Sequence, residues 1–198
     1  MPTSATLSSC RDEPPVLSWT VERYHRLVET GILGEDQRTE LIEGRILAVS
    51  PPSGRHAGRL RALIDLLGRR VAGRALLDAQ NPLELDQASE PQPDLMLLAP
   101  RADYYASRHP RATDALLVVE VMLSSARYDR EVKLPLYARA GVGEVWLIDV
   151  DSGTVEAYTE PGPHGYARRR AIDARGSLAP TALPDVILTG SELLGPTS

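Results

Sequence analysis

Residues 115–121 read Ala-Leu-Leu-Val-Val-Glu-Val, and this stretch decides the fold. It is apolar at nearly every position, which is typical of a central strand covered on both faces. Working outward, residues 95–98 and residues 144–149 form two further apolar runs of strand length. Residues 154–158 follow the last run after a turn at Gly153, so we expect them to be its hairpin partner.

Helical patterns lie between these strands. Residues 56–72 carry leucine, isoleucine and valine at spacings of three and four, which predicts a long amphipathic helix. A second helix is expected at residues 128–140, with Pro135 inside it as a possible kink. Near the N-terminus, Thr20 is a plausible N-cap of a first helix, and residues 39–50 read as strands joined by a turn. This order predicts a mixed α/β fold, with a central sheet flanked by helices and additional N-terminal strands.

The bulk properties describe an ordinary globular protein. The chain has 198 residues and a net charge of −5, which argues against global attraction to nucleic acid without excluding a local basic groove. We expect a flexible tail at residues 1–17 and one domain at residues 18–198. Cys10 is the single cysteine, so no disulfide framework forms. We find no apolar run long enough for a membrane span and no secretory signal, and therefore expect a cytoplasmic protein.

Two acids interrupt the apolar runs. Asp94 follows Pro93 directly before one run, and Glu120 lies inside another. A carboxylate in such a place is costly to bury unless something pairs with it. Two carboxylates and the ammonium of Lys133 make up the inventory of a magnesium site that cleaves phosphodiesters, because magnesium prefers hard oxygen ligands.

These residues resemble the PD-(D/E)XK signature of restriction-endonuclease-like proteins and, more narrowly, the Uma2 family of bacterial endonucleases. The resemblance covers about residues 18–160 and rests on these segments of the sequence: residues 39–45, 52–56, 92–94, 118–133, 137–142 and 144–149. It implies that Asp94 and Glu120 approach one another in the sheet and ligate a metal, and that Glu40 supplies a further acid. The lysine expected two residues after Glu120 is replaced by Met122, and Lys133 matches its relocated position.

We therefore expect metal-dependent phosphodiester hydrolysis with Mg²⁺ or Mn²⁺. By analogy the substrate is DNA, and a homodimer would supply one site per strand. The alternative is a nuclease-like module that binds nucleic acid or a protein partner without cutting, and a weaker one is a metal hydrolase of another kind.

Several assignments stay open at this stage. Lys133 either serves the site or pairs with Asp129, four residues earlier on the same helix. Glu43 competes with Glu40 for the role of the extra acid.

Basic residues around the long helix leave a second set of alternatives. His56 is either a phosphate contact, a general base or a polar residue at a helix start. Arg55 and Arg59 belong to an arginine-rich patch that either holds phosphates or is a solvated face. The other three histidines lack metal-ligand spacing and receive no role: His25, His109 and His164.

Overall fold

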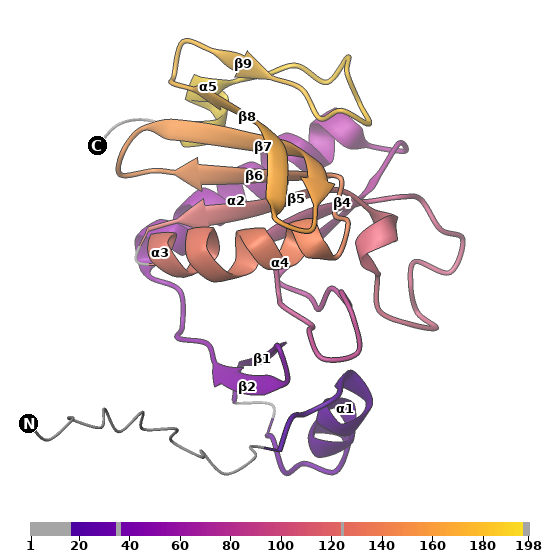
Figure 1. Ribbon diagram of the computed structural model, residues 1–198. Coiled ribbons are helices and arrows are strands. Elements are labelled where there is room, and N and C mark those ends of the chain that lie inside the picture. Colours follow the sequence, from indigo (N-terminus) through magenta and orange to yellow (C-terminus); the bar gives the residue numbers. More distant parts are fainter. Residues whose placement is uncertain (1–16, 35–36, 124, 196–198) are drawn as a thin grey trace, which may run out of the picture.

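The centre of the molecule is a six-stranded mixed sheet (Figure 1). The computed structural model describes residues 17–34, 37–123 and 125–195. In spatial order the strands are β3 (Leu76–Ala79), β4 (Leu95–Leu98), β5 (Ala115–Met122), β6 (Glu144–Asp149), β7 (Thr154–Gly162) and β8 (Gly165–Ile172). Only β5 and β6 pair in parallel within this sheet; the other neighbours are antiparallel. The predicted mixed central sheet is confirmed, and β5 is one of its two middle strands.

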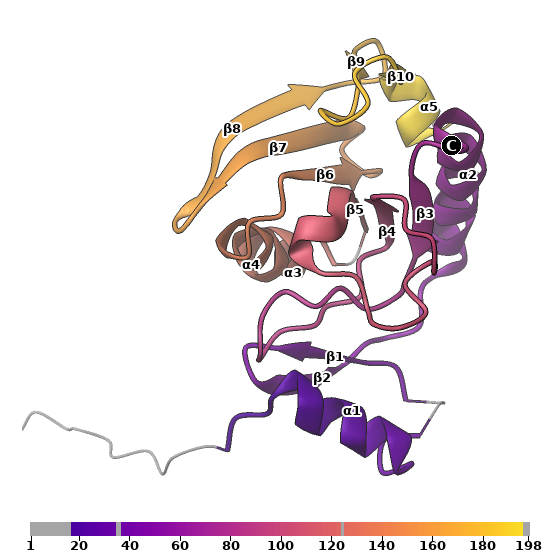
Figure 2. The ribbon, with the colours of Figure 1, turned by 90° about the vertical axis from the view of Figure 1, so that its right-hand side faces the viewer.

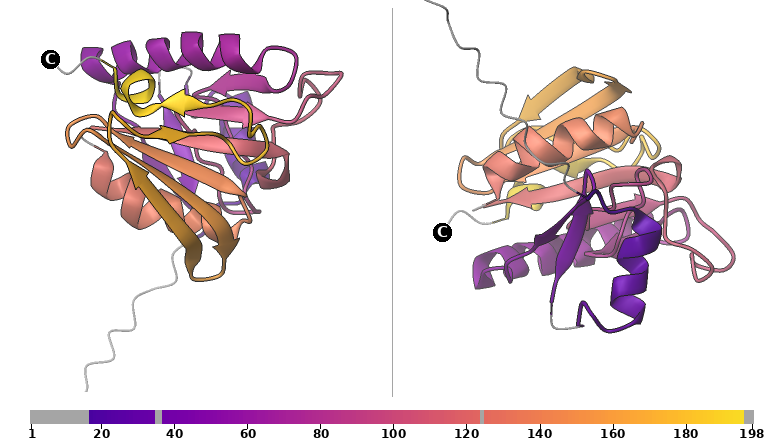
Figure 3. Two further views of the ribbon diagram at one scale, coloured as in Figure 1. Left: turned by 90° about the horizontal axis from the view of Figure 1, so that it is seen from above. Right: turned by 60° about the horizontal axis from the view of Figure 1, so that its bottom comes forward.

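Helices cover both faces of this sheet. The helical segments are α1 (Val21–Glu29), α2 (Gly54–Val71), the 3₁₀ turn η1 (Ala112–Asp114), α3 (Ala126–Tyr128), the π-helical η2 (Asp129–Lys133), α4 (Leu134–Arg139) and α5 (Gly190–Leu194). Viewed from above, α2 lies on one side of the sheet and α4 on the other (Figure 3).

Strand β5 sends alternate side chains into two separate cores. Leu117 and Val119 pack in the core that includes the apolar stripe of α2. Val118 and Met122 pack in the opposite core with Tyr137 of α4. Because both faces are covered, nearly every residue of the strand must be apolar. Glu120 has the same parity as Val118 and Met122, so its side chain faces the α4 layer.

Helix α2 begins and ends close to the predicted bounds. The hydroxyl of Ser53 caps its N-terminus by accepting a hydrogen bond from the backbone N–H of His56 at 3.2 Å. Leu60, Leu63 and Leu67 are buried on its inner face. The cap fixes the first turn of α2, and with it the position of His56.

The crossover between β5 and β6 carries the second predicted helix. Parallel neighbours cannot be joined by a tight turn, so the chain crosses the sheet through α3, η2 and α4. Pro135 lies at the start of α4 and has no N–H to donate. The turn immediately before it is π-helical and ends at Lys133, which agrees with the expected local disruption at Pro135.

The N-terminal strands form a separate hairpin below the main sheet, with α1 beside it (Figure 2). β1 (Thr39–Ile42) pairs with β2 (Arg45–Ala48) in antiparallel register. Glu43 and Gly44 join them with φ angles of 48° and 74°, as a tight two-residue turn requires. A bridge between Leu41 and Glu90 ties the hairpin to the segment that leads into β4.

The C-terminal segment completes the α2 side of the molecule. β9 (Ser177–Leu178) pairs with β10 (Leu188–Thr189), and α5 contributes Leu193 and Leu194 to the α2-side core. In the part of the chain that is described, we find no helix with the length and apolar character needed to cross a membrane. The expected tail at residues 1–17 falls almost entirely outside the described residues, and the division into a tail and one domain stays a prediction.

Candidate active site

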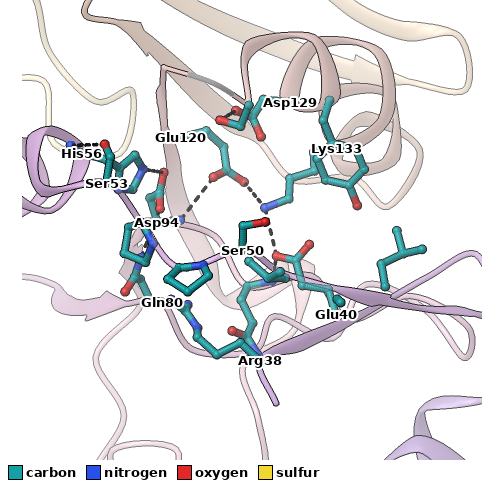
Figure 4. A pocket seen from close by; sticks show the side chains of 18 residues that line it. Arg38, Glu40, Ser50, Ser53, His56, Gln80, Asp94, Glu120, Asp129 and Lys133 are labelled. Atoms are coloured by element: carbon teal, nitrogen blue, oxygen red, sulfur yellow. Dashed lines mark hydrogen bonds and ion pairs between the residues drawn. The ribbon is translucent and has the colours of Figure 1, made fainter. Parts of the chain in front are cut away.

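A cleft of about 510 Å³ lies between the N-terminal hairpin and the main sheet (Figure 4). Its lining comes from the hairpin, the start of α2, the segment before β4, strand β5 and the helix after it. Four of the predicted residues line this cleft, and with them the predicted helix-start histidine: Glu40, Asp94, Glu120, Lys133 and His56. The structure thus brings together side chains from five segments that are far apart in sequence.

Glu120 is the most deeply placed acid of the cleft. Glu120 is 2% exposed, and its Oε1 accepts a hydrogen bond from the Tyr137 hydroxyl at 2.6 Å. The same oxygen lies 3.2 Å from Nζ of Lys133, and Oε2 accepts from the backbone N–H of Asp94 at 3.3 Å. Burial raises the pKa of Glu120 to about 8, against the opposing effect of Lys133 and with the help of neighbouring acids.

Asp94 lies directly before β4 at the cleft wall. Its Oδ2 accepts hydrogen bonds from the backbone N–H of Val121 at 2.9 Å and from Nε2 of His56 at 3.0 Å. Burial alone would raise the pKa of this carboxyl, but the bond and charge of His56, the Val121 N–H and Lys133 outweigh it, so the pKa is lowered. Asp94 is therefore ionised at neutral pH. In turn, its hydrogen bond raises the pKa of His56 against the opposing effect of burial.

Lys133 places its ammonium between two carboxylates. Nζ lies 3.0 Å from Oε1 of Glu40 and 3.2 Å from Oε1 of Glu120, while the side chain is 8% exposed. Burial by itself would lower the lysine pKa, but the charges of Glu120, Glu40 and Asp129 raise it. Lys133 is thus a buried cation aimed at the acids. Its alternative role as a partner of Asp129 does not match the ion pairs found among the described residues.

The hairpin places the two candidates for the extra acid, Glu40 and Glu43, in different surroundings. Glu40 is buried on β1, where Oε1 accepts from the backbone N–H of Gln92 at 2.9 Å and contacts Lys133. Glu43 lies on the turn, points outward and pairs with Arg139. Glu40 therefore faces the cleft and Glu43 does not.

Met122 stands where the resemblance to the broad superfamily predicts a lysine, and it does not line the cleft. The side chain of Met122 is fully buried in the α4-side core. Lys133 lies on the helical segment that covers the same face of β5 as Met122 and Glu120, so its ammonium contacts Glu120 from that face. The relocated lysine of the sequence comparison is thus consistent with the geometry.

Sequence reasoning missed two side chains of this site. Asp129 lines the cleft and is buried; its Oδ2 accepts a hydrogen bond from the Ser125 hydroxyl at 2.6 Å. Burial raises the pKa of Asp129 to about 6. The hydroxyl of Tyr137 holds Glu120 from behind. The four-residue spacing to Lys133 is a usable signal for Asp129. Tyr137 begins a segment that carries the family resemblance, but its sequence neighbours do not indicate a contact with Glu120.

Arg55 and Arg59 belong to the patch for which phosphate binding and a solvated face were both open, and their contacts lie outside the cleft lining. Arg55 pairs with Asp151 at 2.5 Å, and the Arg59 guanidinium donates to the backbone carbonyl of Glu192 at 2.6 Å. Neither lines the cleft, whereas Arg38 of the segment before β1 does. Arg69 and Arg70 at the end of α2, and Arg74 just after it, each pair with an acidic side chain. The solvated-face interpretation therefore fits this patch better.

The donor set of the cleft fits a hard divalent cation. Four acids line it, Glu40, Asp94, Glu120 and Asp129, against three basic side chains, Lys133, His56 and Arg38. The raised pKa of Glu120 and of Asp129 reflects this crowding as well as burial. A divalent cation held by oxygens would relieve the repulsion, and carboxylate oxygens are the ligands that Mg²⁺ prefers.

Comparison with known proteins places this architecture in the restriction-endonuclease-like class. A solved structure titled as that of "a putative nuclease belonging to DUF820" from Anabaena variabilis ATCC 29413 matches with a TM-score of 0.71 at 18% identity, covering 91% of this chain and 98% of that one. The model of the Uma2 family, described as "Putative restriction endonuclease", matches residues 21–190, and the chain belongs to this family. No curated protein matches the chain.

Proposed function

We propose that the protein hydrolyses phosphodiester bonds in DNA with the help of Mg²⁺ or Mn²⁺. The observation that carries the proposal is the convergence of Glu40, Asp94 and Glu120 on one cleft, with the buried ammonium of Lys133 within 3.2 Å of two of them. Membership of a family described as restriction endonucleases supports the same reaction class. A bacterial source and a cytoplasmic location form part of the same proposal and rest on the resemblance and the sequence.

Asp94 and Glu120 would hold the cation, with Glu40 as an outer or second ligand. When bound, the cation supplies positive charge that promotes ionisation of water and neutralises the transition state. Asp94 is suited to this task because its lowered pKa keeps it ionised. Tyr137 and the backbone N–H of Asp94 fix the orientation of the Glu120 carboxylate.

Lys133 would orient the attacking water and stabilise the developing negative charge. Its raised pKa keeps it protonated, so it acts here as a donor and a charge rather than as a base. Arg38, which lines the same cleft, would pair with a flanking phosphate, as guanidinium groups commonly do. His56 would hold Asp94 in place through its 3.0 Å contact.

The second candidate function is binding of nucleic acid or a protein partner without cleavage. The net charge of −5 favours the protein-partner form of this alternative, because an acidic chain attracts nucleic acid poorly. The position of the Lys133 ammonium favours the nuclease, because a binding module does not need a lysine held between two buried acids.

The test is a substrate panel of single-stranded DNA, duplex DNA and RNA, run with Mg²⁺, with Mn²⁺ and with a chelator. We expect cation-dependent cleavage of DNA, its loss in Asp94→Asn, and full activity in Asp185→Asn. Asp185 is a matched control because it is an exposed acid paired with Arg74 outside the cleft. Equal activity in Asp94→Asn and wild type would trace the cleavage to a contaminant. No cleavage of any substrate by a folded protein would favour the binding module.

A further inference from the structure

Outside the cleft, three side chains with metal-binding atoms meet on the N-terminal side of the molecule. They are His25 of α1, Glu90 of the segment bridged to β1, and His109 of the loop before η1. One ligand atom from each lies within 4.8 Å of the others. The His25 and His109 rings stand edge to face with centroids 5.3 Å apart. Neither histidine could be assigned a metal role from its sequence spacing, because the three residues are far apart along the chain and only the fold joins them.

Glu90 gives this cluster its charge. Its side chain is 1% exposed, and Nε2 of His25 lies 2.9 Å and 3.0 Å from its two oxygens. Over the described ranges, no other group lies within hydrogen-bond distance of this carboxylate. A single imidazole N–H cannot satisfy two carboxylate oxygens, and a buried carboxylate without full pairing is costly. A cation between the three side chains would supply what is missing.

The donor types select the cation. Two imidazole nitrogens and one carboxylate oxygen form a ligand set for Zn²⁺, often with water in the remaining position. Tetrahedral Zn²⁺ with bonds of about 2.1 Å places its ligand atoms roughly 3.4 Å apart. His25 and Glu90 are already near that separation. His109 needs to move by no more than about 1.4 Å, the difference between the 4.8 Å limit and that spacing. Its exposed position on a loop allows this.

We propose that His25, Glu90 and His109 form a Zn²⁺ site that fastens α1 to the segments leading into β4 and β5. A metal ion here would add a link between α1 and the segments leading into β4 and β5. These parts otherwise share few polar contacts, such as the hydrogen bond from the Val21 N–H to the Gln87 carbonyl at 2.8 Å. None of the three ligands lines the cleft. The two sites also differ in chemistry, because nitrogen ligands favour Zn²⁺ and an all-oxygen set favours Mg²⁺.

The experiment measures Zn²⁺ binding to the metal-stripped full chain by calorimetry, together with the shift of its unfolding temperature. The variants are His109→Ala and His25→Gln, each in an Asp94→Asn background so that the cleft contributes less. His109→Ala is the main variant because its side chain is exposed, and His25→Gln keeps an amide donor for Glu90. His164→Ala is the matched control, an exposed histidine on the turn between β7 and β8.

We expect one equivalent of Zn²⁺ to bind and to raise the unfolding temperature in the parent and in His164→Ala. In His109→Ala the affinity should fall by more than about 100-fold, since losing even an outer partner of a ligand costs 10–100-fold. Mg²⁺ should not compete. Equal Zn²⁺ affinity in His109→Ala and the parent would overturn the proposal, as would efficient displacement of Zn²⁺ by Mg²⁺.

Discussion

Replacing Glu120 with glutamine should remove a large part of the pH dependence of stability. Burial raises the pKa of this carboxyl from 4.5 to about 8 in the folded protein. Between these two values the folded state keeps a proton that the unfolded state has released. The free energy of unfolding therefore falls as the pH rises through this window, and Glu120→Gln, which cannot titrate, escapes that fall.

The size of the effect follows from the same shift. A difference of about 3.5 pKa units, at about 1.4 kcal/mol each, gives an upper value of roughly 5 kcal/mol across the window. Asp129, with its pKa raised to about 6 by burial, and His56, with its pKa raised by the hydrogen bond to Asp94, add slopes of the same sign. Both groups remain in the variant, so the difference between the two curves reports Glu120 together with its interaction with Asp129.

The assay is urea unfolding followed by tryptophan fluorescence at several pH values from about 5 to about 8, with a chelator present. Wild type should lose several kcal/mol over this range, and Glu120→Gln should lose clearly less. Added Mg²⁺ near pH 8 should restore stability to the wild type. Glu144→Gln is the control and should respond in the same way, because Glu144 is a buried glutamate of β6 that lies outside the cleft and is hydrogen-bonded to Trp146 and Thr181. Parallel pH curves for wild type and Glu120→Gln would refute the reasoning.

Three further outcomes follow from the packing and hydrogen bonds. Above about pH 8, where Glu120 is ionised, Tyr137→Phe removes a 2.6 Å bond to a buried charge and should cost about 1.5–3 kcal/mol in urea unfolding. Tyr166→Phe removes a bond to a neutral main-chain carbonyl and should cost less, about 0.5–1.5 kcal/mol. Leu63→Ala empties a fully buried site under α2 and should cost about 2–5 kcal/mol, whereas Ile64→Ala on the outer side should cost well under half of that by the same measurement. Thermal unfolding should show a higher midpoint with Mg²⁺ than with chelator, because a ligand that binds only the folded state stabilises it; identical midpoints would argue against cation binding in the cleft.

The sequence by itself determined the layers of this protein. The unbroken apolar run of β5 required cover on both faces, and the stripe on α2 supplied one of the covers. Asp94 and Glu120 were recognisable as candidates because an acid in an apolar strand region needs a partner when it is buried, whatever the tertiary fold. These features are local, because burial and periodicity can be recognised from residues that are close together in the sequence.

Only the tertiary structure decided which partners meet. Glu40 and Glu43 are nearly equivalent in sequence, yet the hairpin turns one toward Lys133 and the other toward Arg139. Arg59 looked like its neighbours on α2 and instead binds the carbonyl of Glu192. Partner choice depends on how distant segments pack against one another, and that information is spread over the whole chain rather than carried by the residues that meet.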